Sequence, residues 1–313
     1  MSIRNKLVVS NMLMVIIPVA IIYARESLNT KVRGKKDLDK LAIPFVGEIP
    51  DCSPQKSAIK TLLEKTNKKK KIVSKTREYV IKEGSRDVVN EAFRVVRTNI
   101  DFMAKDRSKN AILFTSFNPG SGKSFIAANL GLSFAIKGKK VLVIDGDLRH
   151  GSASAYVNSP SHGICDYLAG SSNDWKKYVV KDSTYPNFHI LPIGKVPPNP
   201  TELIEEGDFE KIIQEARPEY DYVFIDCPPI DILADTQIIE KWTDRTIFVV
   251  RAGLMDRSMV PEIDKVYTSK KYKNVGLILN GTWGGGKYGY KYGYKYGYKY
   301  GYSYGHNYYG SEK

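Results

Sequence analysis

Residues 111–124 read AILFTSFNPGSGKS, and this stretch decides the fold. The β-prone run at 111–116 predicts a buried strand, and the apolar residues at helical spacing in 123–137 predict a helix. The connection at 117–124 holds two glycines and the run Gly-Lys-Ser. Strand, glycine-containing loop and helix in this order form the context that a phosphate-binding loop requires. We therefore predict a nucleotide site at this loop.

The loop residues suit a nucleoside triphosphate. Gly120 and Gly122 let backbone N–H groups approach phosphate oxygens, Lys123 can neutralise the β- and γ-phosphates, and the Ser124 hydroxyl can ligate magnesium. Phe117 stands where the usual pattern has its first glycine, which is a departure. The residues predicted to bind ATP here are Pro119, Gly120, Ser121, Gly122, Lys123, Ser124 and Phe125.

Two further strands are predicted to end in aspartate. Residues 141–145 read VLVID and end in Asp145, whereas residues 220–226 read YDYVFID and end in Asp226. Ligands bind outside the carboxyl ends of the strands in an open parallel sheet, so both carboxylates should face the loop. With Ser124 they are the predicted Mg²⁺ ligands. The alternative is that each aspartate caps an ordinary turn.

The remaining periodic segments predict the fold class. A helix is expected at 208–217 and strands at 246–251 and 275–281. The order predicts an α/β P-loop NTPase with a mostly parallel sheet and helices on both faces, spanning residues 79–283. Asn280, at the carboxyl end of the last strand, is predicted to read an adenine edge, the alternative being a loop cap.

The charge of the chain lies at its ends. The net charge is +14, yet residues 81–286 hold 26 Lys/Arg and 26 Asp/Glu. Residues 1–80 carry 17 against 7, and residues 287–313 carry 5 against 1. A nucleic-acid-binding domain should be basic in its folded part, so we expect no nucleic-acid partner. The three cysteines are far apart and fit a reducing compartment.

The N-terminal segment predicts a membrane helix. Residues 7–24 carry no charge and are followed by more basic residues than precede them, which places the rest of the chain in the cytoplasm. A buried core helix and a signal peptide are the alternatives. We thus expect a transmembrane helix with its flanks at 1–27, single-pass in the cytoplasmic (inner) membrane, and a basic juxtamembrane linker at 28–78.

The last segment, residues 284–313, is predicted to be a disordered tail. Lys-Tyr-Gly-Tyr repeats four times from 287 to 302, a composition that offers no apolar stripe to bury. A phosphoacceptor role is expected, with an adhesive segment or an aggregation-prone strand as the alternatives. The expected acceptors are Tyr288, Tyr290, Tyr292, Tyr294, Tyr296, Tyr298, Tyr300, Tyr302, Tyr304, Tyr308 and Tyr309.

Taken together, these residues resemble the bacterial tyrosine kinases (BY-kinases) of capsule and exopolysaccharide export. The resemblance rests on a variant Walker A at 117–124, a Walker A′ at 141–149, a Walker B at 223–229, the PPNPxEL-like segment at 197–203 and the tyrosine cluster. Glu91, Arg94 and Arg97 match the family's EX2RX2R motif, which implies contacts between neighbouring subunits of a ring; on a helix, this spacing places them on nearly one face.

The resemblance implies an ATP- and Mg²⁺-dependent protein-tyrosine kinase that phosphorylates its own tail in trans within an oligomeric ring. Its catalytic residues would be Lys123, Asp145, Asp147 and Asp226, with Asp145 or Asp147 positioning or deprotonating the tyrosine hydroxyl. The implied role is regulation of polysaccharide polymerisation and export. The implied partners are the export machinery, a cognate tyrosine phosphatase and a separate membrane activator chain.

The main alternative is a membrane-associated ATPase switch of the MinD/ParA type, without kinase activity. Those proteins carry a second lysine five residues before the P-loop lysine, where this chain has Asn118. BY-kinases usually carry an extracytoplasmic domain and a further membrane helix ahead of the kinase domain. The sequence leaves open whether this chain is a fragment or part of a split system.

Overall fold

The computed structural model of the chain describes residues 14, 16–24, 27–52, 77–104, 106, 108–230 and 234–283. The expected tail with its phosphoacceptor tyrosines lies outside these residues, as does part of the expected membrane segment. Residues 14 and 16–24 of that segment are helical. Among the described residues, no helix is both long and apolar enough to cross a membrane.

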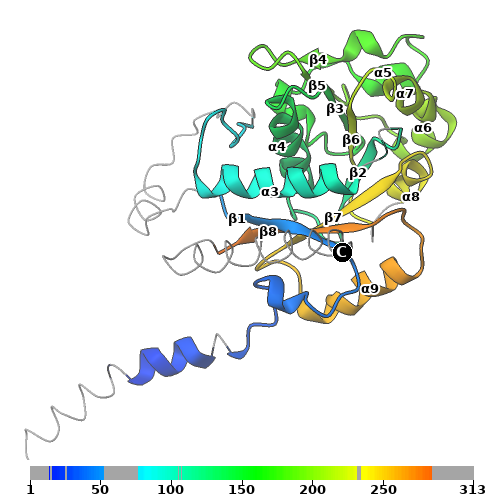
Figure 1. Cartoon of the computed structure of the whole chain (residues 1–313). Helices are drawn as coiled ribbons and strands as arrows, with labels where there is room; N and C mark the ends of the chain where they lie inside the picture. Colours follow the sequence, from blue (N-terminus) through cyan, green and yellow to red (C-terminus); the bar gives the residue numbers. More distant parts are fainter. Residues whose placement is uncertain are drawn as a thin grey trace, which may run out of the picture.

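One eight-stranded sheet organises the chain (Figure 1). Its strand order is β1-β8-β7-β2-β6-β3-β5-β4, and every neighbouring pair is parallel except β4 and β5. The strands are β1 (Phe45–Pro50), β2 (Ala111–Thr115), β3 (Val141–Asp145), β4 (Val180–Lys181), β5 (Phe188–Leu191), β6 (Tyr222–Asp226), β7 (Arg245–Arg251) and β8 (Gly276–Thr282).

The central strands are apolar throughout because both of their faces are covered. Every residue of β2, β3 and β6 is buried, as expected for a parallel sheet with helices on each side. Successive side chains point to opposite faces, so Phe114 packs in the core beneath one helix layer and Leu113 in the core beneath the other.

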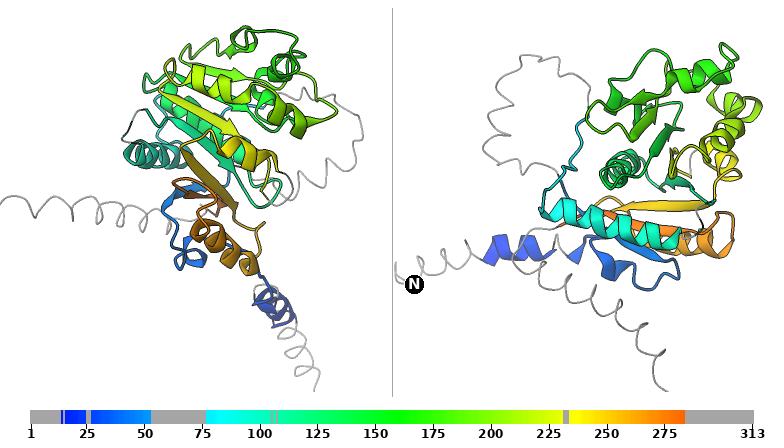
Figure 2. Two further views of the ribbon diagram at one scale, coloured as in Figure 1. Left: turned by 90° about the vertical axis from the view of Figure 1, so that its right-hand side faces the viewer. Right: turned by 45° about the horizontal axis from the view of Figure 1, so that its top comes forward.

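Helices cover both faces of the sheet (Figure 2), which confirms the predicted α/β fold. The first layer consists of α3 (Val88–Met103) and α4 (Lys123–Ala135). The other face carries α5 (Ile164–Leu168), α6 (Pro200–Glu206), α7 (Phe209–Ala216), α8 (Asp235–Glu240) and α9 (Val260–Thr268). Short 3-10 turns lie at η1 (Lys35–Asp37), η2 (Ser154–Val157), η3 (Lys176–Tyr178) and η4 (Arg257–Met259).

The folded domain begins earlier than the sequence suggested. Strand β1 lies within the expected linker at 28–78, yet it pairs in parallel with β8 at the edge of the sheet. Residues 27–43, which we call the N-terminal clasp, pack beside α9, where Val32 is fully buried. These residues therefore belong to the domain. Their partners lie more than two hundred residues away, so no local pattern indicates the pairing.

Candidate nucleotide site

The predicted phosphate-binding loop lies between the end of β2 and the start of α4. Gly122 is the N-cap of α4 and has φ of +90°, a left-handed conformation that favours glycine. A Cβ atom on Gly122 would lie 2.3 Å from the side-chain nitrogen of Asn280. The Ser121 hydroxyl donates to the Asn118 carbonyl (2.7 Å) and closes the loop on itself. The glycine is thus required both by conformation and by space.

Lys123 and Ser124 form the first turn of α4, and both side chains are buried. The N-terminus of this helix presents unpaired N–H groups and the positive end of the helix dipole, which favours an anion. Phe117, in place of the usual glycine, is buried and packs on Phe248 with their ring centroids 5.5 Å apart. Phe117 therefore anchors the start of the loop in the core.

Two side chains that follow the loop in sequence support it from neighbouring strands. The side-chain amide of Asn280, on β8, donates to the Ser121 carbonyl (2.9 Å). Arg251, at the end of β7, donates to the Gly120 carbonyl (3.2 Å). No sequence pattern indicated the Arg251 contact. Asn280 thus holds the loop in place, and its reading of an adenine edge stays a prediction.

Asp145 and Asp226 lie side by side at the carboxyl edge of the sheet, where they are paired residues of β3 and β6. Both are fully buried. One oxygen of Asp145 accepts from the backbone N–H and the hydroxyl of Ser154, each at 2.7 Å. The other oxygen of Asp145 and both oxygens of Asp226 have no hydrogen-bond partner among the described residues.

Burial disfavours the ionised form of both carboxyl groups. Burial, and then the charge of Asp226, raise the pKa of Asp145. Burial also raises the pKa of Asp226, while the charge of Lys123 opposes the rise. Buried carboxylates with unpartnered oxygens suit a hard divalent cation. Asp145, Asp226 and Ser124 therefore fit Mg²⁺, and their role as its ligands stays a prediction.

Asp147 lies two residues after Asp145 and is also buried. Its carbonyl accepts from the backbone N–H groups of His150 (3.1 Å) and Gly151 (3.0 Å), which closes a tight turn. Its carboxylate lies 3.1 Å from a ring nitrogen of His150, whose side chain is largely exposed. The predicted base therefore stands between the buried carboxylates and solvent.

Arg149 extends from the same turn into a polar junction that the sequence did not reveal. It donates to the Thr201 hydroxyl (2.9 Å) and lies 3.4 Å from the carboxylate of Asp235. Thr201 in turn donates to Asp235 (2.6 Å), which is fully buried at the start of α8. The junction ties the Walker A′ turn to α6 and α8 and so fixes the segment that carries Asp147.

Comparison with known proteins agrees with this geometry. The family described as AAA domain matches residues 109–255. The tyrosine-protein kinase YwqD of Bacillus subtilis (strain 168) is 35% identical over 193 residues, covering 61% of this chain and 81% of that protein. The tyrosine-protein kinase CpsD of Streptococcus agalactiae serotype III (strain NEM316) is 34% identical over 222 residues, covering 70% and 88%.

The chain belongs to the bacterial tyrosine kinase family. A solved structure, the kinase domain of the Escherichia coli tyrosine kinase ETK, superposes with a TM-score of 0.68 at 26% identity. That match covers 82% of this chain and 97% of the other. The shared region takes in the sheet and helices that position the site, so the site residues can be considered against the family's motifs.

The family's EX2RX2R motif lies on α3, and its three residues do not share one environment. Arg94 forms an ion pair with Glu91, and both side chains are about one-third exposed. Arg97 instead turns toward α4, where it donates to the carbonyl (2.7 Å) and the hydroxyl (3.0 Å) of Ser133. Part of this motif therefore holds α3 to α4 within one chain.

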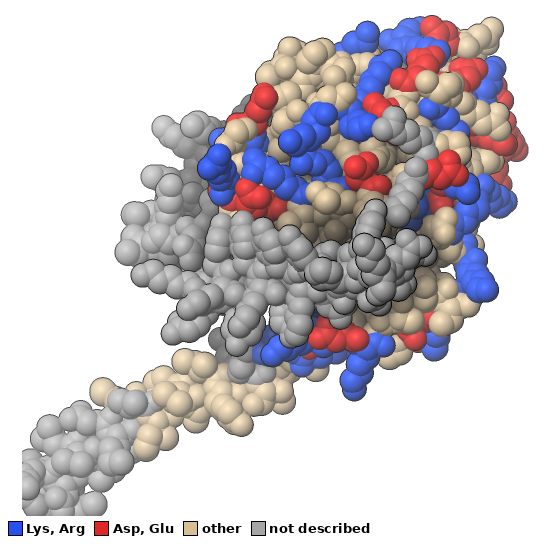
Figure 3. All heavy atoms as spheres, viewed as in Figure 1, with Lys and Arg blue, Asp and Glu red and all other residues tan. Residues whose placement is uncertain are grey.

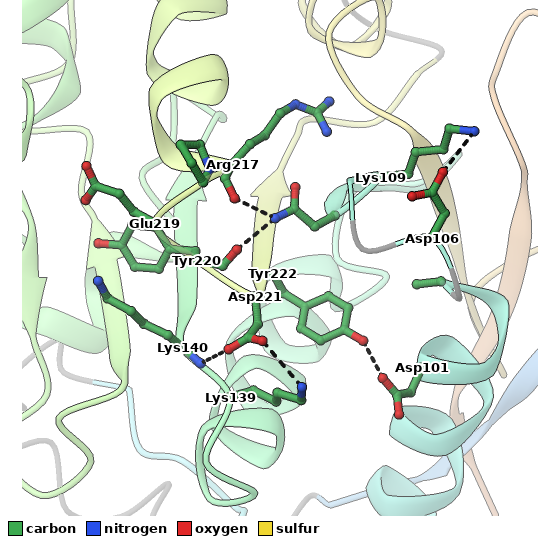
Figure 4. Close-up of a pocket in the computed structure, with 13 residues that line it drawn as sticks. Asp101, Asp106, Lys109, Lys139, Lys140, Arg217, Glu219, Tyr220, Asp221 and Tyr222 are labelled. Atoms are coloured by element: carbon green, nitrogen blue, oxygen red, sulfur yellow. Dashed lines mark hydrogen bonds and ion pairs between the residues drawn. The ribbon is translucent and has the colours of Figure 1, made fainter.

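A cleft of about 510 Å³ lies at the amino ends of β2, β3 and β6, away from the loop (Figure 4). Its charged side chains largely satisfy one another. Asp221 pairs with Lys139 (3.3 Å) and accepts from the Lys140 N–H (2.8 Å), and the Tyr222 hydroxyl donates to Asp101 (2.5 Å). This cleft is not the nucleotide site of the family.

Proposed function

We propose that this member of the family is an ATP-dependent protein-tyrosine kinase that phosphorylates the tyrosines of its own tail. The observation that carries the proposal is the buried pair Asp145 and Asp226 beside Lys123, whose carboxylates include oxygens with no partner among the described residues. The relatives named tyrosine-protein kinases support it. The eleven tyrosines between 288 and 309 provide acceptors on the same chain.

The site residues divide the work of phosphoryl transfer. The backbone of residues 120–124 and the Lys123 ammonium would bind the β- and γ-phosphates and stabilise charge on the transferred group. Ser124, Asp145 and Asp226 would hold Mg²⁺, which when bound neutralises phosphate charge. Asp147 would orient the acceptor and take its proton. The tyrosine oxygen bonds to the γ-phosphorus as the bond to the ADP oxygen breaks.

The wider role is also a proposal. Transfer in trans within a ring, with Glu91 and Arg94 at the contact, would bring one subunit's tail to its neighbour's site. Each phosphotyrosine adds about −1.5 to −2 charges, so about three would cancel or reverse the +4 of residues 287–313. That charge change would loosen the assembly, and a cognate phosphatase would reset it. One relative is named a putative tyrosine-protein kinase in a cps region, which supports a role in capsule polysaccharide export.

Membrane attachment through residues 7–24 completes the proposal, with the kinase domain and the tail in the cytoplasm. The helical residues 16–24 expose their apolar side chains, as a lipid-facing helix would. The kinase domain would act together with a separate membrane activator chain. The neutral folded core argues against a nucleic-acid partner.

The direct test is to incubate the purified chain with ATP and Mg²⁺ and to map phosphate by mass spectrometry. We expect phosphotyrosine between Tyr288 and Tyr309, lost in Lys123→Met. Lys137→Met is the matched control, since Lys137 is exposed just beyond the other end of α4, and it should keep the signal. Full phosphorylation of Lys123→Met would refute the site. ATP turnover without phosphotyrosine would favour the ATPase switch.

A mixing experiment tests transfer in trans. The Lys123→Met chain, which keeps its tail, is incubated with an active chain whose tail tyrosines are changed to phenylalanine. Phosphate on the inactive chain is expected if neighbouring subunits exchange tails. Phosphate that appears only when site and tail are on one chain would refute the ring arrangement and leave the kinase assignment intact.

A further inference from the structure

The N-terminal clasp is bound firmly to the body of the domain. Val32 donates its N–H to the Met255 carbonyl (2.9 Å) and accepts from the Gly253 N–H (2.8 Å). The Arg257 N–H donates to the Thr30 carbonyl (2.8 Å). Because Val32 is also fully buried, the clasp cannot leave without exposing core surface. The chain that enters from helical residues 16–24 therefore joins the domain almost at once.

Ion pairs fasten the clasp further to the region around α9. Lys31 lies 3.5 Å from Asp256, and Arg257 lies 3.0 Å from Asp37. Near the other end of the clasp, the backbone N–H of Ala42 donates to the Asp264 side chain (3.2 Å). Contacts along the whole clasp thus fix one surface, made of the clasp and residues 253–273, which we call the basal surface.

The basal surface is basic. It carries ten Lys/Arg against five Asp/Glu, and four of the five acidic side chains already contact the clasp or a neighbouring lysine or arginine. Figure 3 shows Lys and Arg side chains along the lower edge of the body, next to the N-terminal helix. Six exposed lysines of this surface form no ion pair with a described residue: Lys35, Lys36, Lys40, Lys270, Lys271 and Lys273. Two of them have other contacts, since Lys35 lies over the Phe45 ring and Lys273 donates to backbone carbonyls.

The apolar helix leaves from this same side. In Figure 1, helical residues 16–24 leave from the lower side of the body, where the clasp and α9 also lie. Ile16, Val19 and Ile22 are each more than half exposed. A run of exposed apolar side chains beside a basic surface matches the two layers of a bilayer, its hydrocarbon core and its anionic headgroups.

We propose that the basal surface, including the lysines after α9, binds an anionic lipid bilayer and sets the kinase domain in one orientation against it. This inference rests on the proposed membrane attachment. Electrostatic attraction fades over about 8 Å at physiological salt, so it acts only on lysines held close to the leaflet. The clasp is bound to the domain and leads into the apolar helix, so it keeps the lysines of the basal surface close to the leaflet. Each such lysine strengthens contact with an anionic surface by about fivefold.

The test uses the full chain reconstituted in bilayers of phosphatidylcholine, alone or mixed with phosphatidylglycerol. Surface lysines are acetylated with a water-soluble reagent and quantified by mass spectrometry. We expect labelling of Lys270 and Lys271 to fall several-fold in the anionic bilayer and to recover at high salt. Lys177 and Lys181, near β4 at the opposite edge of the sheet, are the internal controls and should not change.

Charge reversal provides the second arm. Lys270→Glu with Lys271→Glu should abolish the lipid-dependent protection of Lys36 and Lys40, whereas Lys177→Glu with Lys181→Glu should leave it intact. Equal labelling in both bilayers, for a chain that is inserted in both, would overturn the inference and leave the attachment standing. A chain that floats with neither bilayer would overturn both. Tail phosphorylation in detergent reports separately on the kinase proposal.

Discussion

Asp145 and Asp226 end two neighbouring parallel strands in register, and both carboxylates are fully buried within reach of the charge of Lys123. Two like charges held this close, with oxygens that have no partner in the described part of the chain, destabilise the fold unless a cation binds. The arrangement makes sense if the site is built for a cation and a nucleotide. The strain is then relieved by the ligands that the reaction needs.

Asp145→Asn should therefore stabilise the ligand-free chain while it abolishes phosphorylation. The amide oxygen can still accept from Ser154, and one buried charge is removed, so we expect a gain of about 1 kcal/mol or more in the free energy of unfolding. Thermal unfolding in the absence of Mg²⁺ measures the gain. Ser154→Ala is a control with the opposite expected sign: it removes a donor to Asp145 and should lower the free energy of unfolding by about 1 kcal/mol. A lower melting temperature for Asp145→Asn would contradict the account.

The same pair predicts a pH dependence. Because burial raises the pKa of both carboxyl groups, the folded chain binds protons here more tightly than the unfolded chain. The pair's contribution to the free energy of unfolding then falls as the pH rises from about 4, the ordinary carboxyl pKa, through the raised values. Above that window the ionised pair is ready for Mg²⁺. Stabilisation by Mg²⁺ with ADP should thus grow with pH.

The measurement for this dependence is the melting temperature with and without Mg²⁺ and ADP across the window. In the ligand-free state, the advantage of Asp145→Asn over the wild-type chain should widen as the pH rises, since only the wild-type pair ionises fully. An advantage that stays constant, or shrinks, would mean that the carboxyl groups titrate normally.

Asn280→Ala should weaken ATP binding by about tenfold, or roughly 1.4 kcal/mol, because the Ser121 carbonyl loses the donor that holds the loop. Gly122→Ala should be worse, since it adds a left-handed alanine and a clash with Asn280. The double variant removes the clash but not the backbone strain. Calorimetry with an ATP analogue measures the affinities of the three variants. A double variant that binds as tightly as the wild-type chain would show that alanine at position 122 causes no backbone strain.

Arg97→Ala should lower the stability of a single chain by about 1–3 kcal/mol, because the Ser133 carbonyl and hydroxyl lose their partner. Glu91→Ala removes a side chain that is about one-third exposed and pairs only with Arg94 among the described residues, so it should change stability little and act on assembly instead. Urea unfolding at low protein concentration separates the effect on the chain from the effect on oligomer size. If Arg97→Ala has the same free energy of unfolding as the wild-type chain, the contact between Arg97 and α4 does not stabilise the fold.

Much of the site could be predicted because its parts are local. The phosphate-binding loop lies between a strand and a helix that are recognisable by period, and the two buried strands each end in an aspartate. Parallel strands bring such ends to one edge of the sheet whatever their detailed packing. The meeting of Lys123, Asp145 and Asp226 therefore followed from the sequence.

Only the tertiary structure decided which distant side chains support these parts. Strand β1 enters the sheet beside β8, Asn280 reaches a loop 159 residues earlier, and Arg97 turns inward to α4. The clasp likewise binds beside α9 rather than forming part of a linker. Such contacts depend on how faces pack and on which partner satisfies each polar group, and neither local periodicity nor motif spacing encodes them.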